Sequence, residues 1–142
     1  IDVEWIRDTK PQRTALYDWV TNKESRLLER REDNSWKFAG GGMEANVRGL
    51  AQVGDALLAG RLLSERGRRE LWTPSRLSGE DRYALGFMVD RDGTVSHNGA
   101  QPGCRAAWFL DPKTKTTVVA LCNTSGNIPI GALTKRVYDK LK

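Results

Sequence analysis

Few residues in this 142-residue sequence can bind a metal or attack a substrate. It contains one histidine, His97, and two cysteines, Cys104 and Cys122, with no Cys-x-x-Cys pair. Structural zinc sites use about four histidine or cysteine ligands at short spacings, so the sequence argues against a metal site. No other cofactor is predicted. No apolar run is long enough to predict a transmembrane segment.

The sequence also lacks the two common motifs of a serine nucleophile. A pair at Ser-x-x-Lys spacing places both side chains on one helix face, where the amine can take the hydroxyl proton. No serine here has a lysine three residues later, and Gly-x-Ser-x-Gly is absent as well. Both cysteines lie in apolar, strand-like runs, a setting that disfavours the reactive thiolate. The chain therefore offers no evident nucleophile of its own.

The composition is that of one globular domain. Hydrophobic residues make up 39% of the chain and charged residues 29%, and the length is near the middle of the usual domain range. The net charge of +5 suits an anionic partner. However, basic and acidic residues alternate, as in "RLLERRED", and no aromatic–basic platform accompanies them. We therefore predict no nucleic-acid partner.

The hydrophobic pattern divides this single domain, residues 1–142, into four parts. We expect a loop-rich segment over 1–40, a helical pair over 46–73, antiparallel strands over 83–123 and a C-terminal helix over 128–142. Consecutive strands with helices before and after them indicate an α+β fold, an antiparallel sheet with flanking helices.

The helical pair has clear signals at its ends. Asn46 and Ser64 are placed to cap two helices, and Gly60 is placed to end the first. The first helix has one apolar face, formed by Val47, Leu50, Ala51, Gly54, Leu57 and Leu58. The apolar face expected for the C-terminal helix consists of Ile130, Leu133, Val137 and Leu141.

His97 stands at the end of an expected short strand, before a glycine-containing turn. A histidine there can be an acid/base, an orienting group or a hydrogen-bond donor to substrate, or simply an exposed residue at a strand end. Gly99 and Gly103 favour a functional site, because glycine lets a backbone N–H lie close to a ligand, as an oxyanion hole requires. Residue type alone leaves these alternatives open.

The two cysteines lie in consecutive β-rich runs joined by the turn "DPKTK". If Leu110 faces Thr116 across that turn, then Cys104 faces Cys122, and the two could form a cross-strand disulfide. Two buried thiols fit the sequence equally well. A disulfide would indicate an oxidising compartment.

The order of these motifs resembles the C-terminal half of the serine β-lactamase-like hydrolases. That group includes class C β-lactamases, DD-peptidases, family VIII esterases and the mitochondrial serine β-lactamase-like protein. The resemblance covers roughly residues 11–142. Its motifs are "AGGG" before a helix ending in "LLAGRLLS", then "WTP", "HNG", "QPG", "DP" and a strand closing in "N". It implies the C-terminal portion of the β-lactamase/transpeptidase-like fold.

The resemblance assigns roles to particular residues. His97-Asn98-Gly99 would be the third active-site box, on the strand that lines the cleft. The N–H of Ala100 would supply half of the oxyanion hole, and Asn98 would hydrogen-bond a substrate carboxylate or amide. Gly40–Gly42 would form a turn near the cleft. The substrate would be a small molecule or peptide with an amide, ester or β-lactam carbonyl.

The chain departs from the family pattern in two ways. The Ser-x-x-Lys and Tyr-x-Asn boxes are absent, and Ala45-Asn46 replaces the usual serine/threonine pair after the glycines. We therefore expect that the nucleophile lies on a missing N-terminal segment. We also expect that this missing N-terminal half, or a partner chain, completes the sheet and the site. The alternative is an inactive, truncated member that serves as a binding or assembly module. The resemblance favours an extracytoplasmic location, periplasmic or secreted, in a bacterium.

Overall fold

The computed structural model describes residues 2–3, 13–21, 24–27, 34–75 and 82–142. Its elements, in chain order, are β1 (Asp2–Val3), β2 (Tyr17–Thr21), β3 (Glu24–Leu27), the 3-10 helix η1 (Ser35–Gly40), β4 (Met43–Glu44), α1 (Val47–Leu58), α2 (Glu65–Leu71), β5 (Met88–Val89), β6 (Val95–Gln101), β7 (Cys104–Asp111), β8 (Thr116–Cys122) and α3 (Ile130–Lys140). None of the described helices is both long and apolar enough to cross a membrane.

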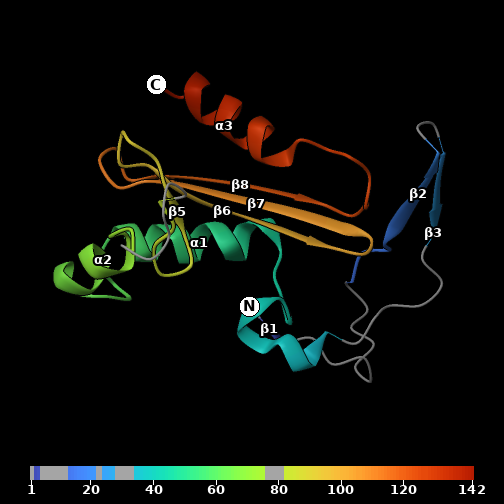
Figure 1. Cartoon of the computed structure of the whole chain (residues 1–142), viewed down its shortest axis with the longest axis horizontal. Coiled ribbons are helices and arrows are strands. Elements are labelled where there is room, and N and C mark those ends of the chain that lie inside the picture. Colours follow the sequence, from blue (N-terminus) through green and yellow to red (C-terminus); the bar gives the residue numbers. More distant parts are fainter. Residues whose placement is uncertain (1, 4–12, 22–23, 28–33, 76–81) are drawn as a thin grey trace.

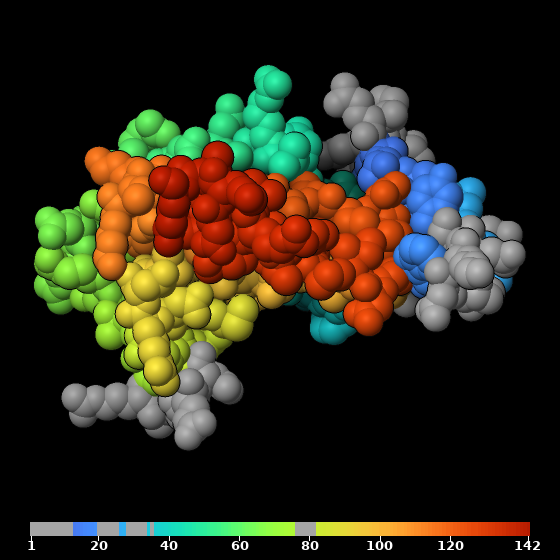
Figure 2. Space-filling model, turned by 90° about the horizontal axis from the view of Figure 1, so that it is seen from above, coloured from blue at the N-terminus to red at the C-terminus, as the bar shows by residue number. Residues whose placement is uncertain are grey.

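The main sheet is antiparallel, with strand order β5-β6-β7-β8. The helix α1 lies against one face and α3 against the other, so the sheet is the middle layer (Figure 1). Seen from above, α3 extends along the sheet (Figure 2). The α+β class predicted from the sequence is confirmed.

The register of β7 and β8 differs by one residue from the expected one. Asp111 pairs with Thr116, and Arg105, not Cys104, pairs with Cys122. Residues directly opposite each other share a face of the sheet and successive residues alternate, so Cys104 and Cys122 point to opposite faces. No disulfide joins them. The predicted facing of the two cysteines is wrong, and the inference of an oxidising compartment loses that support.

The helix α1 forms where the sequence predicts it. The Asn46 side chain accepts a hydrogen bond from the Gly49 N–H at 2.8 Å, which satisfies one of the free amides of the first turn. Gly60, at φ +76°, follows the helix in the left-handed conformation that glycine adopts readily. Leu57 and Leu58 are buried against the sheet, where they join Val95 and Leu110 in one core.

Of the four apolar residues predicted for the buried face of the C-terminal helix α3, only Ile130 is buried. Ile130, Thr134 and Tyr138 are buried, whereas three apolar side chains remain exposed: Leu133 at 42%, Val137 at 52% and Leu141 at 66%. Thr134 can be buried because its hydroxyl donates to the Ile130 carbonyl within the helix, at 2.7 Å.

Two further segments differ from expectation. The segment 1–40, expected to be loop-rich, contains the antiparallel hairpin β2–β3 among its described residues. The strand expected from Tyr83 onward shortens to β5, with one isolated bridge between Tyr83 and Met88. Gly86, at φ +82°, makes a turn there, and the Ala84 N–H donates to the Phe87 carbonyl across it.

Candidate active site

The strand β6 carries His97, Asn98, Gly99 and Ala100, the four residues that the family resemblance assigned to a site. The expected turn after His97 is absent, because β6 continues to Gln101 and pairs with β7 along its whole length. The turn follows at Pro102 and Gly103, with Gly103 at φ +77°. A proline followed by a glycine at positive φ is typical of a type II turn. The candidate residues are therefore held by a ladder of backbone hydrogen bonds.

The side chains of His97 and Asn98 lie on opposite faces of the sheet, because successive strand residues alternate. His97 shares its face with Val95, which packs in the core that includes Leu57 of α1. Asn98 lies on the α3 side, where its Oδ1 is 3.0 Å from the position that a Cβ on Gly131 would take. A substrate can therefore contact both His97 and Asn98 only at the edge of β6.

His97 is hydrogen-bonded to a residue that the sequence did not single out. The Nε2 of His97 and the hydroxyl of Tyr83 are 2.7 Å apart. Their rings make an edge-on contact, with centroids 5.9 Å apart and an angle of 64° between planes. The hydrophobic pattern predicts a strand from Tyr83 onward, but no local pattern predicts a contact between residues fourteen positions apart.

The backbone around Tyr83 is fixed on both sides. Its carbonyl accepts a hydrogen bond from the Ser75 N–H at 3.0 Å, after α2. The Leu85 N–H donates, at 3.2 Å, to the carbonyl of Leu71, which is the last residue of α2. Two backbone contacts therefore connect the segment that presents Tyr83 to the end of α2.

One edge of β6 is open beyond its contact with β5. The last pair of that ladder is Met88 with Ser96, and no strand in the described part of the chain pairs with this edge further along. Backbone groups alternate in direction along an antiparallel strand. The two-residue turn after Gln101 closes on a hydrogen-bonded pair with Cys104, so the N–H groups of Asn98 and Ala100 face the open edge.

The glycine-rich segment lies beside the same end of β6. The Lys37 Nζ donates to Oε1 of Gln101 at 3.1 Å. A Cβ on Gly41 would come within 2.7 Å of Nε2 of Gln101, so the two segments lie close together here. The structure therefore brings η1 and the following glycines next to the strand with His97, as the family resemblance implied.

A small hollow of about 150 Å³ lies on the α3 side of β6. Its lining includes Asp90, Ser96, Asn98, Gly131 and Lys135. It is far smaller than the pockets that enclose drug-sized ligands, which span about 300–1,000 Å³. Asn98 therefore lines a minor recess.

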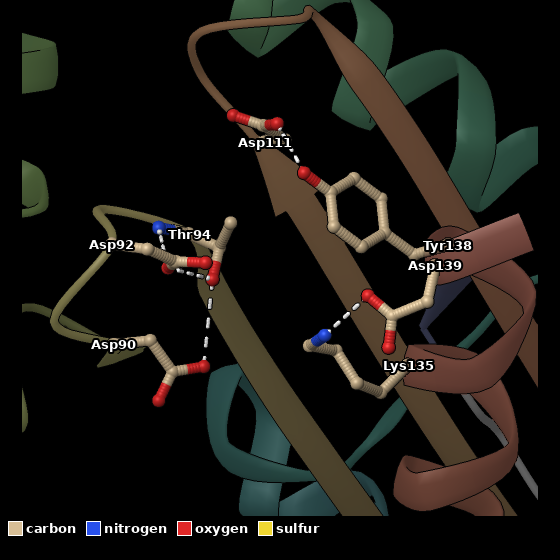
Figure 3. Close-up of polar contacts among 7 residues, drawn as sticks. All are labelled: Asp90, Asp92, Thr94, Asp111, Lys135, Tyr138 and Asp139. Atoms are coloured by element: carbon tan, nitrogen blue, oxygen red, sulfur yellow. Dashed lines mark hydrogen bonds and ion pairs between the residues drawn. The ribbon is translucent and has the colours of Figure 1, made fainter. Parts of the chain in front are cut away.

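The carboxylates near β6 have structural partners. Thr94, which is buried, donates its hydroxyl to Asp92 at 2.7 Å and contacts Asp90 at 3.4 Å (Figure 3). Hydrogen bonds from the Thr94 hydroxyl and N–H hold the pKa of Asp92 below its ordinary value. Within the described residues, no group of three or more histidine, cysteine, aspartate or glutamate side chains is placed to bind a metal.

Comparison with known proteins assigns the family. The family model described as Beta-lactamase matches residues 4–141, and the chain belongs to this family. A search of curated proteins gives no match.

Two solved structures share the fold. A D-stereospecific amidohydrolase from Streptomyces sp. is 23% identical, with a TM-score of 0.63 over 82% of this chain and 36% of its own. A penicillin binding protein from Bacillus halodurans is 17% identical, with a TM-score of 0.72 over 99% of this chain and 43% of its own. The chain thus spans less than half the length of either protein.

Proposed function

We propose that this chain is the C-terminal part of a serine hydrolase that forms an acyl-enzyme from an amide, peptide, ester or β-lactam carbonyl. The observation that carries the proposal is the open edge of β6, where an exposed His-Asn-Gly-Ala run presents backbone donors. The nucleophilic serine and its lysine lie on a segment N-terminal to this chain. That the similar Streptomyces protein is a D-stereospecific amidohydrolase supports the amide among these substrates.

In this proposal the N–H of Ala100 donates to the oxyanion that develops when the serine attacks the carbonyl. A backbone donor held in a strand ladder is preorganised, which is the property that stabilises a developing charge. Asn98 contributes a second outward N–H beside it for the substrate backbone. His97 positions the substrate from the α1 side of the strand.

Gly99 supports the proposal because the fold makes no demand for glycine there. A Cβ at this position would make only ordinary contact, 3.6 Å, with the Cβ of Ala106. The residue does not have a left-handed φ either. A glycine without a structural need on an open strand edge suits close approach of a ligand to the backbone.

The site is completed by a partner polypeptide, either the N-terminal half or a second chain. Within the described residues, the outer edge of β8 pairs with no strand along Thr116–Cys122, and only Tyr17 of β2 bridges to Thr124 beyond its end. The helix α3 exposes Leu133, Val137 and Leu141. Unpaired strand edges and apolar helix faces are the surfaces that a completing half covers. By family resemblance we also propose an extracytoplasmic location, which a signal sequence upstream of Ile1 would support.

The test joins this chain to its upstream coding segment and measures hydrolysis of chromogenic esters, amides and β-lactams. Ala100→Pro removes the proposed donor without removing a ladder hydrogen bond, and a loss of kcat of about 10²–10³-fold is expected. Ala100→Ser keeps the N–H and serves as the control, with activity close to the parent.

The 142-residue chain alone is expected to be inactive. Hydrolysis by this chain, abolished by a serine-directed inhibitor, would show that the nucleophile is not on another segment. An upstream sequence without Ser-x-x-Lys would instead favour the inactive binding or assembly module.

A further inference from the structure

We propose that Tyr83 is a positioning residue that fixes the tautomer of His97, so that neutral His97 acts as a hydrogen-bond donor through Nδ1. The inference rests on the proposed function for the role of that donor toward substrate. The contact itself rests on the geometry of the Tyr83–His97 pair alone.

A neutral imidazole carries one proton, on either Nδ1 or Nε2. A phenol is much more acidic than a neutral imidazole N–H, and a phenol oxygen is a weaker acceptor than an imidazole nitrogen. In the 2.7 Å contact, Tyr83 therefore donates its O–H and the Nε2 of His97 accepts. The ring proton must then be on Nδ1.

Backbone hydrogen bonds hold the segments on both sides of the pair. On one side, His97 is fixed by the β6–β7 ladder, in which it pairs with Trp108. On the other side, the backbone of Tyr83 is connected to Ser75 and to the end of α2 through the hydrogen bonds described above. The edge-on ring contact further restricts rotation of the imidazole. Neither ring can turn away without breaking the hydrogen bond.

This tautomer limits what His97 can do. With Nε2 occupied by the Tyr83 hydroxyl, neutral His97 has no free nitrogen lone pair with which to take a proton from substrate. Its Nδ1–H can donate to a carbonyl or carboxylate oxygen instead. The sequence left acid/base, orienting and donor roles open, and the contact with Tyr83 selects the donor role.

The tautomer can be observed directly, because His97 is the only histidine in the chain. The chain is labelled with ¹⁵N-histidine, and two-bond ¹H–¹⁵N correlation spectra are recorded at a pH where the imidazole is neutral. The expected spectrum shows a protonated Nδ1 and an unprotonated Nε2. A protonated Nε2 in the wild-type chain would overturn the proposal.

Two tyrosine variants complete the test. Tyr83→Phe removes only the hydroxyl from an exposed ring, and the ¹⁵N shifts are expected to move to a mixture of both tautomers. Tyr17→Phe is the matched control, because Tyr17 is on β2, in a different sheet from His97, and its spectrum should equal the wild type. Unchanged tautomer populations in Tyr83→Phe, with the thermal midpoint preserved, would also overturn the proposal.

The spectrum requires no catalysis, so the two proposals fail separately. A fixed Nδ1–H tautomer in a protein that hydrolyses nothing would support the proposal for Tyr83 and His97 and would contradict the proposed hydrolase function. An active hydrolase in which Nε2 carries the proton would support the proposed function and would contradict the proposal for Tyr83 and His97.

Discussion

The hydroxyl of Tyr138 on α3 donates a hydrogen bond to Oδ2 of Asp111, the last residue of β7 (Figure 3). Both residues are buried. The same carboxylate also accepts from the Thr114 hydroxyl and from the Lys113 N–H, each at 2.8 Å. One aspartate thereby organises the β7–β8 turn and anchors the C-terminal helix on the sheet.

Tyr138→Phe is expected to destabilise the chain by about 1.5–3 kcal/mol, the usual range for a hydrogen bond to a charged group. The ring contact with Phe109, with centroids 4.6 Å apart, remains in the variant, so the change isolates the hydroxyl. Urea unfolding followed by tryptophan fluorescence measures the difference. Tyr17→Phe is the control and should change stability by less than about 0.5 kcal/mol. Equal midpoints for both variants would contradict a stabilising role of the hydroxyl.

Acid should weaken the fold partly through Asp111. Its burial opposes ionisation, but hydrogen bonds from Tyr138, Thr114 and the turn amides outweigh burial and hold its pKa below the ordinary value. A lowered pKa stabilises the folded state above the unfolded-state value of about 3.9, and this stability is lost as the pH falls through the folded-state pKa.

The measurement for Asp111 is the free energy of unfolding as a function of pH. Asp111→Asn should be less stable near neutrality and should lose less stability on acidification than the wild type. The pKa of Asp92 is lowered as well, so Asp92 also makes the free energy of unfolding fall on acidification, and this contribution persists in Asp111→Asn. Parallel pH profiles for the wild type and Asp111→Asn would rule out the linkage.

Two glycines of α1 should respond in opposite directions to alanine. A Cβ on Gly54 would lie 2.6 Å from Cγ2 of Thr117 and 2.9 Å from Cδ2 of Leu110 on the sheet. Such overpacking is expected to cost about 1–3 kcal/mol. A Cβ on Gly49 would meet nothing closer than the Asn46 side chain, at 3.4 Å.

Gly49→Ala should therefore gain up to about 1 kcal/mol from helix propensity. Thermal unfolding of the two variants, compared with the wild type, gives both values. A stable Gly54→Ala would mean that α1 is not packed as closely on the sheet as described.

Unreduced protein should contain two reactive thiols after unfolding. The expectation follows from the one-residue register, which turns Cys104 and Cys122 to opposite faces of the sheet. A colorimetric thiol titration in denaturant counts them, with a reduced sample as the reference. A count of zero, with an intact mass two hydrogens lower, would contradict the register.

Local signals in the sequence predicted those features of the fold that depend only on neighbouring residues. The caps Asn46 and Ser64 and the left-handed Gly60 need only neighbouring backbone, and the structure has all three. The face of α3 depends instead on a distant partner. Tyr138 is buried because Asp111 accepts its hydroxyl, and no periodicity of apolar residues contains that information.

The residues of the candidate site also divide into those that local sequence signals predict and those that depend on tertiary structure. The motif predicted a site at the run His97 to Ala100, and the structure places this run on an exposed strand. Tyr83 was missed because its relation to His97 arises from the turn at Gly86 and from the end of α2, which are tertiary features. The cysteine register was missed by one residue because the length of the "DPKTK" turn does not fix which residues pair.

The strand β8 also bears on how the chain behaves in solution. Its seven residues include no charge and four β-branched side chains, and among the described residues no strand pairs with its outer edge along Thr116–Cys122. The strand β2 reaches this edge only beyond the end of β8, where Tyr17 forms an isolated bridge with Thr124. Proline, charge and a covering helix are the usual protections of such an edge, and the first two are missing from this run. Concentrated samples of the isolated chain should therefore aggregate by adding strands to β8, with a rate that rises with protein concentration.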